Sequence, residues 1–559
     1  MNPRLLWILA MAACRPRPAL DFAEPPKLDD EDPSDGRFEA TLTAARTSRT
    51  FDGQPVDFLA YNGSVPGPQL RVKVGDEVLV HFVNDLPTDA DWASGVHWHG
   101  IEGYNAADGT PVTQMAVGQG AAFDYRFVAT RPGIYWYHPH IRGAQALFSG
   151  LYAPLIVEDP AEAELVARGV LPADDRVLQL SDTWVSQGRI TSAEVDDPME
   201  IMNGTEGRSL LVNGELAPTL EVAAGSAVRL RVINSSITRF WRLSVPGHTL
   251  YRVGGEGGLL DAVRVEGGTV TGERFDVATG ASRGPAEVDL GYPRGQIVLG
   301  PGDRADVVLV TDGAPGEQLE LRWEDVARGR HDMFMDGDTM VMEDAEDDGA
   351  RPGETVATFV LVDRGAAPFS IAEGDPLLAA VGRSVTVIDD TGARDWSGDA
   401  GTSLDEEMGS VQREDGSWEM TMSLGMNRVS WMPDHHAGPD QAEAPTAKHA
   451  KLGDTLRWEV HNRSRMAHPY HLHGFSFQPV EWVQWPDPET EDDGTAVRVP
   501  WTFAEFADTE ILPGFSSLFF RVTLDDPAGD GSAAGRWMQH CHILQHGENG
   551  MMSELVVAP

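Results

Sequence analysis

Many of the histidines in this chain come in pairs separated by one residue. Four His-x-His pairs occur, at 97/99, 138/140, 471/473 and 540/542, far more than 17 histidines scattered over 559 residues would form by chance. In an extended strand alternate side chains share one face, so both imidazoles of a pair can reach one metal centre. Imidazole binds copper, zinc, iron and nickel. The pairs therefore predict a cage of eight imidazoles without identifying the metal.

The last pair lies in a segment that narrows the choice of metal. In HCHILQHGENGMM, Cys541 stands between the paired histidines and must face away from them, towards His546 and Met551. A second histidine for this group, His468, is available in HPYHLHG. Two imidazoles, a thiolate and a weakly bound thioether form the ligand set of a blue copper site. The backbone around Cys541 then joins this copper to the cage and provides a route for electrons.

These motifs need strands to position them, and the chain is rich in short alternating segments from Phe38 onward. Three stretches share the outline of a strand, a glycine turn, a second strand and a closing Asn: LRVKVGDEVLVHFVN (70–84), LEVAAGSAVRLRVIN (220–234) and KHAKLGDTLRWEVHN (448–462). Three copies predict three β-sandwich domains, over residues 37–165, 166–370 and 371–559. Residues 390–418, rich in Asp, Glu, Gly and Ser, are expected to form a surface loop.

Taken together, the motifs resemble those of a known family. HWHG, WYHPH, HPYHLHG and HCHILQHGENGMM have the order and spacing of the three-domain multicopper oxidases and are similar to those of bacterial laccases, which include spore-coat laccases and periplasmic cuprous oxidases. The resemblance extends over about residues 38–559. It implies an all-β protein of three cupredoxin-like Greek-key β-sandwich domains, with four copper ions as cofactors and O2 as the electron acceptor.

The resemblance also implies which side chains bind which copper. The type 1 copper, in the third domain, is expected to bind His468, Cys541, His546 and Met551. The type 2 copper is expected to bind His97 and His471. The type 3 pair is expected to take His99, His138, His140, His473, His540 and His542. With a thioether rather than an apolar group at the axial position, we expect a lowered type 1 potential, which favours easily oxidised donors.

Reduction of O2 to water consumes protons, so an acid should lie near the cage. Asp108, in ADGTPVTQ, resembles the family acid beside the type 2 copper; the alternative is a plain turn aspartate in an Asp-Gly step. The chain departs from the similar laccases and cuprous oxidases around His546, where they carry an acid on each side and this chain has Gln545 and Gly547. Glu548 is a candidate replacement for those acids.

The electron donor stays open between two classes. Segment 331–348 places His331 and four methionines (Met333, Met335, Met340 and Met342) among six aspartates and two glutamates, and a second group holds Met420, Met422, Met426, Met432, His435 and His436. Thioethers bind Cu(I) and carboxylates bind Fe(II) or Mn(II), although alternating methionine also fills strand cores. Oxidation of phenols or aromatic amines is the leading hypothesis, and oxidation of Cu(I), Fe(II) or Mn(II) is the alternative. A copper-sequestering exported protein without turnover is the alternative of another class.

The N-terminus resembles an export signal. An arginine precedes the apolar run Leu5–Ala13, which is too short to span a bilayer, and Cys14 follows. Residues 1–14 are therefore predicted to be a signal peptide, with the mature protein in the periplasm or at the cell surface. Met11–Cys14 resembles a lipobox, which implies a lipid anchor at Cys14; cleavage after Ala12 is the alternative. Residues 15–36 are expected to be a flexible tether.

The overall charge excludes one class of partner. The chain has 87 acidic and 43 basic side chains, for a formal net charge of -44. A polyanion does not bind nucleic acid through its phosphates. The expected partners are O2 and a small organic or metal-ion donor, and the expected state is a monomer.

Overall fold

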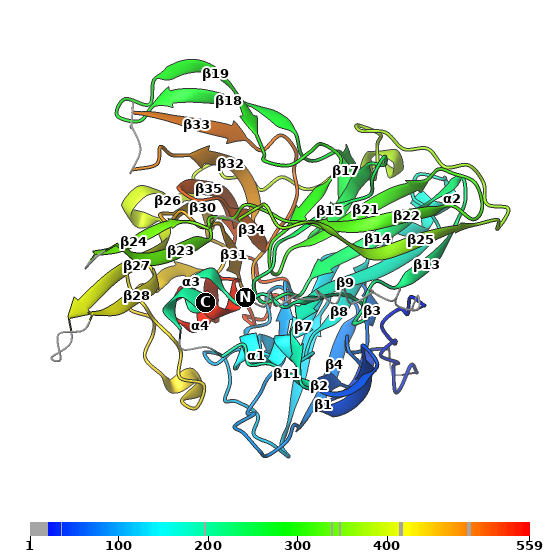
Figure 1. The fold of residues 1–559 in the computed structure, drawn as a ribbon, viewed down its shortest axis with the longest axis horizontal. Helices are drawn as coiled ribbons and strands as arrows, with labels where there is room; N and C mark the ends of the chain where they lie inside the picture. Colours follow the sequence, from blue (N-terminus) through cyan, green and yellow to red (C-terminus); the bar gives the residue numbers. More distant parts are fainter. Residues whose placement is uncertain are drawn as a thin grey trace, which may run out of the picture.

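The computed structural model describes residues 21–559 except 35, 195–196, 337–338, 346–347, 413–417 and 489–493; the side chains of 333–344 and 407–422 also lie outside the description. The predicted signal peptide with Cys14, and the side chains of Met333, Met335, Met340, Met342, Met420 and Met422, thus fall outside it. The described chain is built mainly of strands with a few short helices (Figure 1). None of its described helices has the length and apolar character needed to cross a membrane.

The N-terminal sheets carry the first two histidine pairs. One sheet has the order β10 (Val185–Ser186), β11 (Arg189–Ile190), β2 (Gln54–Tyr61), β1 (Phe38–Phe51), β4 (Glu77–Asp85) and β6 (Ala122–Val128). The other has the order β3 (Leu70–Lys73), β8 (Ala153–Glu158), β7 (Gly133–His138) and β5 (His97–His99). Trp98, Tyr125 and Tyr137 are buried in the core that these strands enclose. Helix α1 (Gly143–Phe148) follows β7.

The central part of the chain forms a second pair of sheets. One has the order β12 (Ser209–Val212), β9 (Asp175–Thr183), β14 (Ser226–Asn234), β21 (Arg304–Thr311), β16 (Leu250–Gly255) and β17 (Gly258–Arg264). The other has the order β13 (Thr219–Ala223), β25 (Glu354–Val362), β22 (Gln318–Glu324), β15 (Trp241–Ser244) and β20 (Ile297–Leu299). Helices α2 (Glu162–Ala167) and α3 (Pro198–Asn203) and the hairpin of β23 (His331–Asp336) and β24 (Thr339–Asp344) lie in the connections.

The C-terminal sheets carry the other two pairs. The larger one joins β19 (Ser282–Asp289), β18 (Thr269–Asp276), β33 (Thr495–Pro500), β32 (Gln478–Gln484), β35 (Ser516–Thr523), β30 (Thr455–Asn462), β27 (Thr402–Gln412) and β28 (Trp418–Met426), with β26 (Arg394–Trp396) against β30. The smaller one joins β29 (Lys448–Lys451), β37 (Met552–Ala558), β36 (Gly535–Cys541), β31 (His468–Leu472) and β34 (Thr509–Leu512). Helix α4 (Leu544–Glu548) follows β36.

The closing Asn of each sequence repeat has the same role in all three copies. Asn84, Asn234 and Asn462 are fully buried at the end of their strands. Each side-chain oxygen accepts a hydrogen bond from the backbone N–H two residues later. Each amide nitrogen donates to backbone carbonyls, two for Asn84 and Asn234 and three for Asn462. A buried amide satisfied in this way fixes the exit of the strand, because leaving its groups unpaired would be costly.

Several segments differ from the sequence-based expectation. Leu28, within the expected tether, is buried against the first core, and Asp21 and Lys27 form β-bridges to Thr219 and Gln69. Residues 21–28 therefore lie on the protein, because their apolar side chains find partners there. The expected loop 390–418 contains β26, β27 and the start of β28, with Leu404 fully buried.

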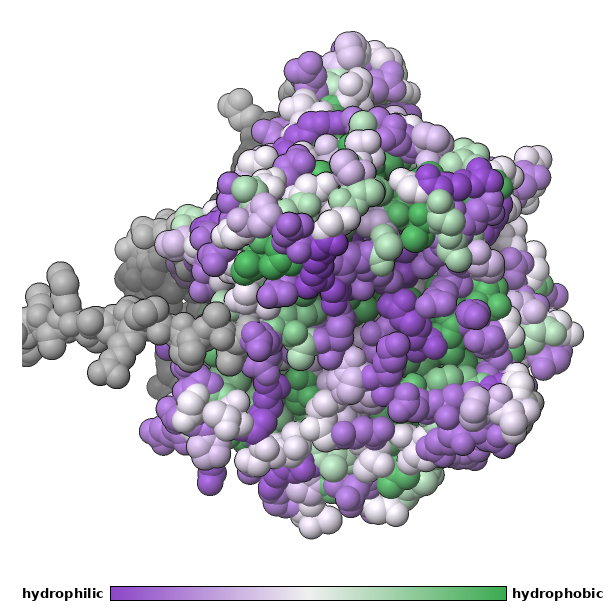
Figure 2. Space-filling view, turned by 90° about the vertical axis from the view of Figure 1, so that its right-hand side faces the viewer, coloured by the Kyte–Doolittle hydropathy of each residue, from purple (hydrophilic) through white to green (hydrophobic). Residues whose placement is uncertain are grey.

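Two hairpins extend sheets in other parts of the chain. The hairpin β18–β19 pairs with β33 and so enlarges the C-terminal sheet, as the upper edge of Figure 1 shows. Strand β11, which pairs with β10, lies beside β2 of the N-terminal sheet. The face in Figure 2 is mostly hydrophilic, with apolar residues in small separate groups, consistent with the high net charge.

Candidate metal centres

Strand register brings the four histidine pairs together. His97 on β5 lies opposite His138 on β7, and His471 on β31 lies opposite His540 on β36. Rings from the two ends of the chain then stack: the centroids of His99 and His471 are 3.8 Å apart. We call the eight paired histidines the imidazole cage; all are buried except His140, which is half-buried.

Within the cage, ligand nitrogens converge in threes. Nitrogens lie within 4.8 Å of one another in three sets: His99, His138 and His542; His140, His473 and His540; and His97, His99 and His471. The first two sets each combine histidines from the N-terminal and C-terminal sheets. The six residues in them are the six that the family resemblance gives to the type 3 pair, and the third set contains the two given to type 2.

Unpaired nitrogens show that the cage fits a metal. Nε2 of His97, His138 and His471, Nδ1 of His99 and both nitrogens of His542 are buried without a hydrogen-bond partner. Nε2 of His540 lies 3.2 Å from Nε2 of His140 and 3.0 Å from Nε2 of His473. Burial, with the nearby His471, lowers the pKa of His540 to about 3. Neutral imidazoles whose lone pairs point at a common position can bind a metal ion there. Without a metal ion, burying these nitrogens with no hydrogen-bond partner would destabilise the fold.

The opposite ring nitrogens are fixed by backbone carbonyls. Nδ1 of His97 donates to the carbonyl of Asp108 (2.8 Å), Nδ1 of His471 to that of Asp508 (2.9 Å) and Nδ1 of His540 to that of Cys541 (2.9 Å). A carbonyl can only accept, so each bond selects the tautomer whose Nε2 carries the lone pair.

Asp108 contacts both halves of the cage. Its carboxylate accepts from Nδ1 of His473 (3.1 Å) and from the Thr110 hydroxyl (2.9 Å), while its backbone carbonyl holds His97. The Asp-Gly turn is needed for this position: a Cβ at Gly109 (φ +77°) would lie 1.9 Å from the Val96 carbonyl. Asp108 is therefore both a turn aspartate and an acid in contact with the cage.

A second carboxylate at the cage, Asp508, escaped the sequence analysis. It lies 2.9 Å from Nε2 of His99, which leaves Nδ1 of that ring for a metal, and the Thr509 hydroxyl lies 3.0 Å from the same Nε2. Burial alone would raise the pKa of Asp508, but the Arg304 guanidinium outweighs it and holds the pKa well below its usual value. Asp508 reaches the cage because the next residue, Thr509 on β34, pairs with His471 on β31. This pairing is not marked by any motif in the sequence.

Cys541 faces away from the cage, as its position between two histidines predicts. Its Sγ lies 3.4 Å from Nδ1 of His468 and 3.8 Å from Nδ1 of His546, and the two nitrogens are 3.2 Å apart. We call these three residues the cysteine site; none of them is exposed. Burial raises the pKa of the Cys541 thiol and lowers that of His546 to about 3. The soft and borderline ligands aimed at one point suit copper.

The other atoms of the cysteine site are held by neutral partners. Nε2 of His468 lies 2.7 Å from the Ser464 hydroxyl, and Nε2 of His546 donates to the Met202 carbonyl of α3 (2.7 Å). Met551 is fully buried in the same apolar cluster as Cys541, and the N–H of Cys541 donates to its carbonyl (3.1 Å). Because α3 covers His546, a donor molecule cannot touch that imidazole directly.

A cavity of about 440 Å³ borders helices α3 and α4. It is lined by Ser192, Ala193, Glu194, Ile201, Gln545, Glu548 and Asn549. Burial raises the pKa of Glu548 to about 7, and its carboxylate accepts from the N–H of Ala144 (3.1 Å). By contrast, a Cβ at Gly547 would lie 3.6 Å from Nδ1 of His540. Glu548 therefore lines this cavity, while position 547 borders the cage.

The described donor candidates of the methionine-rich segments, His331, Met426, Met432, His435 and His436, belong neither to the imidazole cage nor to the cysteine site. Segment 331–348 contains the hairpin β23–β24, and His331 is buried. Met426 is buried in the C-terminal core and Met432 is 58% exposed. His435 and His436 lie with Asp91 near the surface, with ligand atoms within 4.8 Å of one another.

β-Sandwiches that enclose clustered imidazoles beside a cysteine define a copper-dependent oxidoreductase that uses O2. Comparison with known proteins agrees. Models described as multicopper oxidase match residues 43–162, 174–286 and 416–559. The chain therefore belongs to the multicopper oxidase family. The prediction of an all-β, cupredoxin-like fold is confirmed.

Relatives match along nearly the whole chain. Multicopper oxidase MmcO of Mycobacterium tuberculosis is 26% identical, covering 98% of this chain and 93% of that protein. Laccase-1 of Botryotinia fuckeliana is 22% identical, covering 92% and 81%. Among solved structures, a multicopper oxidase from Campylobacter jejuni described as a metallo-oxidase has a TM-score of 0.68 at 21% identity, covering 97% of this chain and 96% of that one.

Proposed function

We propose that the protein is a laccase-type oxidase that couples one-electron oxidation of phenols or aromatic amines to the four-electron reduction of O2 to water. The observation that carries this proposal is the contact of Cys541 Sγ with two imidazoles, on a residue whose chain neighbours are both cage histidines. Bound copper supplies one-electron redox chemistry at the cysteine site and O2 reduction at the cage. A sequestering protein would have no need to connect the two sites covalently.

Four copper ions account for the ligand sets. His468, Cys541, His546 and Met551 hold the type 1 copper. His97 and His471 hold type 2. The type 3 pair is held by His99, His138 and His542 on one side and by His140, His473 and His540 on the other, the same two sets in which the ligand nitrogens converge.

The chain supplies the electron route and the protons. One peptide bond joins Cys541 to His540 and another joins it to His542, so the shortest covalent route from the cysteine site enters both type 3 sets. Asp108 is the proton relay: its carboxylate accepts from Nδ1 of His473 and from the Thr110 hydroxyl, so it lies at the cage where protons are consumed.

The organic donor binds in the cavity beside α4. Ile201 lines this cavity and precedes Met202, whose carbonyl accepts from His546. Gln545 and Asn549 also line it. Glu548, with its pKa near 7, can accept the proton that a phenol loses on oxidation. A relative named laccase is consistent with this donor class.

A metal ion is the second candidate donor, and the cover over His546 favours it. His546 is unexposed and bonded to the Met202 carbonyl, so α3 offers electrons a route to this imidazole. The same helix carries the half-buried Met199. Thioethers bind Cu(I) well. A metal ion held on the outer side of α3 needs no contact with the imidazole.

The protein is exported and acts as a monomer in the periplasm or at the cell surface, with a lipid anchor if Cys14 is acylated. The arginine, short apolar run and small residues before Cys14 support export. Mass spectrometry of the mature N-terminus distinguishes an acylated Cys14 from cleavage after Ala12.

The test is oxygen uptake by the copper-loaded protein with 2,6-dimethoxyphenol, p-phenylenediamine, Cu(I) and Fe(II), each compared with Cys541→Ser. The wild type is expected to be blue and to consume O2 with the organic donors, while Cys541→Ser loses both properties. Uptake with the metal ions alone would favour the second candidate. A blue protein without uptake from any donor would support sequestration and contradict both.

A further inference from the structure

We propose that Arg328 is a positioning residue that sets the potential of the cysteine site: its buried positive charge raises the reduction potential of the copper bound there. The inference rests on the proposed function, because it takes copper at His468, Cys541 and His546 as given. It concerns a residue from the segment between β22 and β23, far in the chain from every ligand motif.

The backbone and the side chain of Arg328 both contact the segment that leads into His468. The N–H of Ala467 donates to the Arg328 carbonyl (2.7 Å), and Nη1 of Arg328 lies 3.5 Å from Sδ of Met466. The Arg328 side chain is 2% exposed. Met466 belongs to the apolar cluster that contains Cys541 and Met551. The guanidinium is therefore separated from the cysteine site by apolar side chains with little water.

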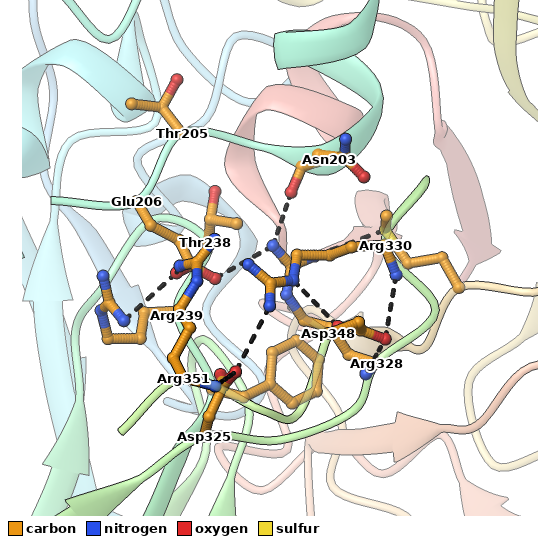
Figure 3. Close-up of polar contacts among 12 residues, drawn as sticks. Asn203, Thr205, Glu206, Thr238, Arg239, Asp325, Arg328, Arg330, Asp348 and Arg351 are labelled. Atoms are coloured by element: carbon orange, nitrogen blue, oxygen red, sulfur yellow. Dashed lines mark hydrogen bonds and ion pairs between the residues drawn. The ribbon is translucent and has the colours of Figure 1, made fainter. Parts of the chain in front are cut away.

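The other face of the guanidinium is fixed by α3 and the chain after it. Nη2 donates to the carbonyl of Asn203 (2.6 Å) and pairs with Glu206 (3.0 Å), and Figure 3 shows Arg328 in this network. Asn203 follows Met202, the residue whose carbonyl holds His546, and its side chain binds the backbone of His331 through both polar atoms. The charge is thus held in one place by the same helix that covers the cysteine site.

The surrounding network leaves this charge only partly compensated. Glu206 is shared among Arg239, Arg328 and Arg351. Asp325 and Asp348 pair with Arg330 rather than with the guanidinium of Arg328. Arginine stays protonated in proteins, even though burial lowers the pKa of Arg328. The single negative charge of Glu206, shared among three arginines, therefore neutralises only part of the positive charge of Arg328.

A nearby positive charge favours the form of a metal site that carries less positive charge. Reduction adds an electron, so the Coulomb energy between Arg328 and the site becomes less repulsive on reduction, and the potential rises. The effect is large where the intervening medium is apolar, because the effective dielectric constant there is low.

The test is a redox titration of the blue absorption in copper-loaded variants. Arg328→Met, which replaces the charge with an apolar side chain beside Met466, should lower the potential by about a tenfold change in the reduction equilibrium constant, which is 59 mV for one electron. Arg328→Lys keeps a charge at this position and should keep the potential near that of the wild type. Arg351→Met removes a cation from the same carboxylate, Glu206, on the exposed side of the network and should change the potential little.

A reciprocal variant covers the case in which Arg328→Met does not fold. Glu206→Gln removes the shared counter-charge, so the potential should rise. An unchanged potential in Arg328→Met with full copper content, an equal fall in Arg351→Met, or a fall in Glu206→Gln overturns the proposal. These results differ from a failure of the proposed function, in which the wild-type protein itself would be colourless or would consume no O2.

Discussion

The imidazole cage and the cysteine site are built from similar ligands, but their ligands contact different kinds of side chain. At the cage, the carboxylates of Asp108 and Asp508 contact ligand imidazoles directly. At the cysteine site the ring nitrogens are held by a hydroxyl and a carbonyl, and the nearby Arg328 is cationic. Neutral imidazoles do not balance the charge of bound metal ions, so carboxylates beside the cage stabilise them there. At the cysteine site the Cys541 thiolate would itself supply negative charge to the metal.

The two sites also differ in how they are assembled. The cage joins β5 and β7 to β31 and β36, so a metal there links the N-terminal and C-terminal sheets. The ligands of the cysteine site all come from the C-terminal part, and α3 of the central part only covers it. We therefore expect metal in the cage to depend on how the parts of the chain dock, and metal at the cysteine site to depend less on docking.

The largest effect is expected from Asp508→Asn, which should lower the copper content of the cage but not that of the cysteine site. Asp508→Asn breaks the buried pair between Asp508 and Arg304, a loss that costs about 3–5 kcal/mol, and leaves Glu256 as the other carboxylate against that guanidinium. It also replaces the ionised acceptor of His99 with a neutral amide. Copper per chain, measured by mass spectrometry, should fall through loss from the cage while the blue absorption is kept.

Asp306→Asn is the matched control for Asp508→Asn. It breaks the buried pair with Arg229 without touching the cage, so it should lower the melting temperature but keep all the copper. Equal copper loss in the two variants would show that the cage depends on general stability rather than on its own carboxylate.

The next effect concerns protons. Asp108→Asn keeps an oxygen near His473 but can no longer take up and pass on protons, so kcat for O2 uptake should fall about 100-fold. The type 1 potential should not change, because Asp108 lies at the cage. Asp124→Asn, an exposed residue paired with His81, serves as the control. A kcat within about twofold of the wild type would leave Asp108 with a purely structural role.

Sequence reasoning could group the predicted ligands because their positions obey short-range rules. The two-residue period of a strand places His97 with His99 and turns Cys541 away from His540 and His542. The repeated Asn at 84, 234 and 462 marks the same strand exit three times. These features depend only on neighbours in the chain, so they can be predicted from spacing.

The partners of the ligands could not be predicted in this way. Asp508 reaches His99 through the pairing of β31 with β34, and Arg328 reaches Met466 through the docking of the segment after β22. Glu406 lies within 4.0 Å of His468 on a strand that composition suggested was a surface loop. Such contacts are set by tertiary packing, and no local pattern around these residues signals them.

At the cysteine site, the axial position gives a smaller effect. Met551→Leu removes the thioether proposed as the weak axial ligand while keeping a buried apolar side chain, so the type 1 potential should rise by about a tenfold change in the reduction equilibrium constant, or 59 mV. Met538→Leu, a buried methionine outside the ligand motifs, is the control. An unchanged or lower potential in Met551→Leu would contradict the axial assignment.

The smallest effect tests whether the cysteine site tolerates a negative charge. The Glu406 side chain is 5% exposed, and one of its oxygens has no hydrogen-bond partner. Burial raises its pKa to about 8, against the opposing effects of Arg328 and the Ser464 hydroxyl. The folded protein therefore holds a proton that the unfolded chain loses above its ordinary pKa of 4.5.

Between about pH 4.5 and 8, Glu406 binds more protons in the folded protein than in the unfolded chain. Its contribution to the free energy of unfolding is therefore present at low pH and is lost as pH rises, at up to about 1.4 kcal/mol per pH unit. Glu406→Gln removes this pH-dependent loss of stability, because glutamine does not titrate. In the metal-free protein the melting temperature of the variant, relative to the wild type, should increase from pH 5 to pH 8, whereas that of the exposed control Glu221→Gln should not. A difference that stays flat across this range would mean that the buried carboxyl group is ionised at the cysteine site, and the contrast in charge between the two sites would then be weaker than the packing indicates.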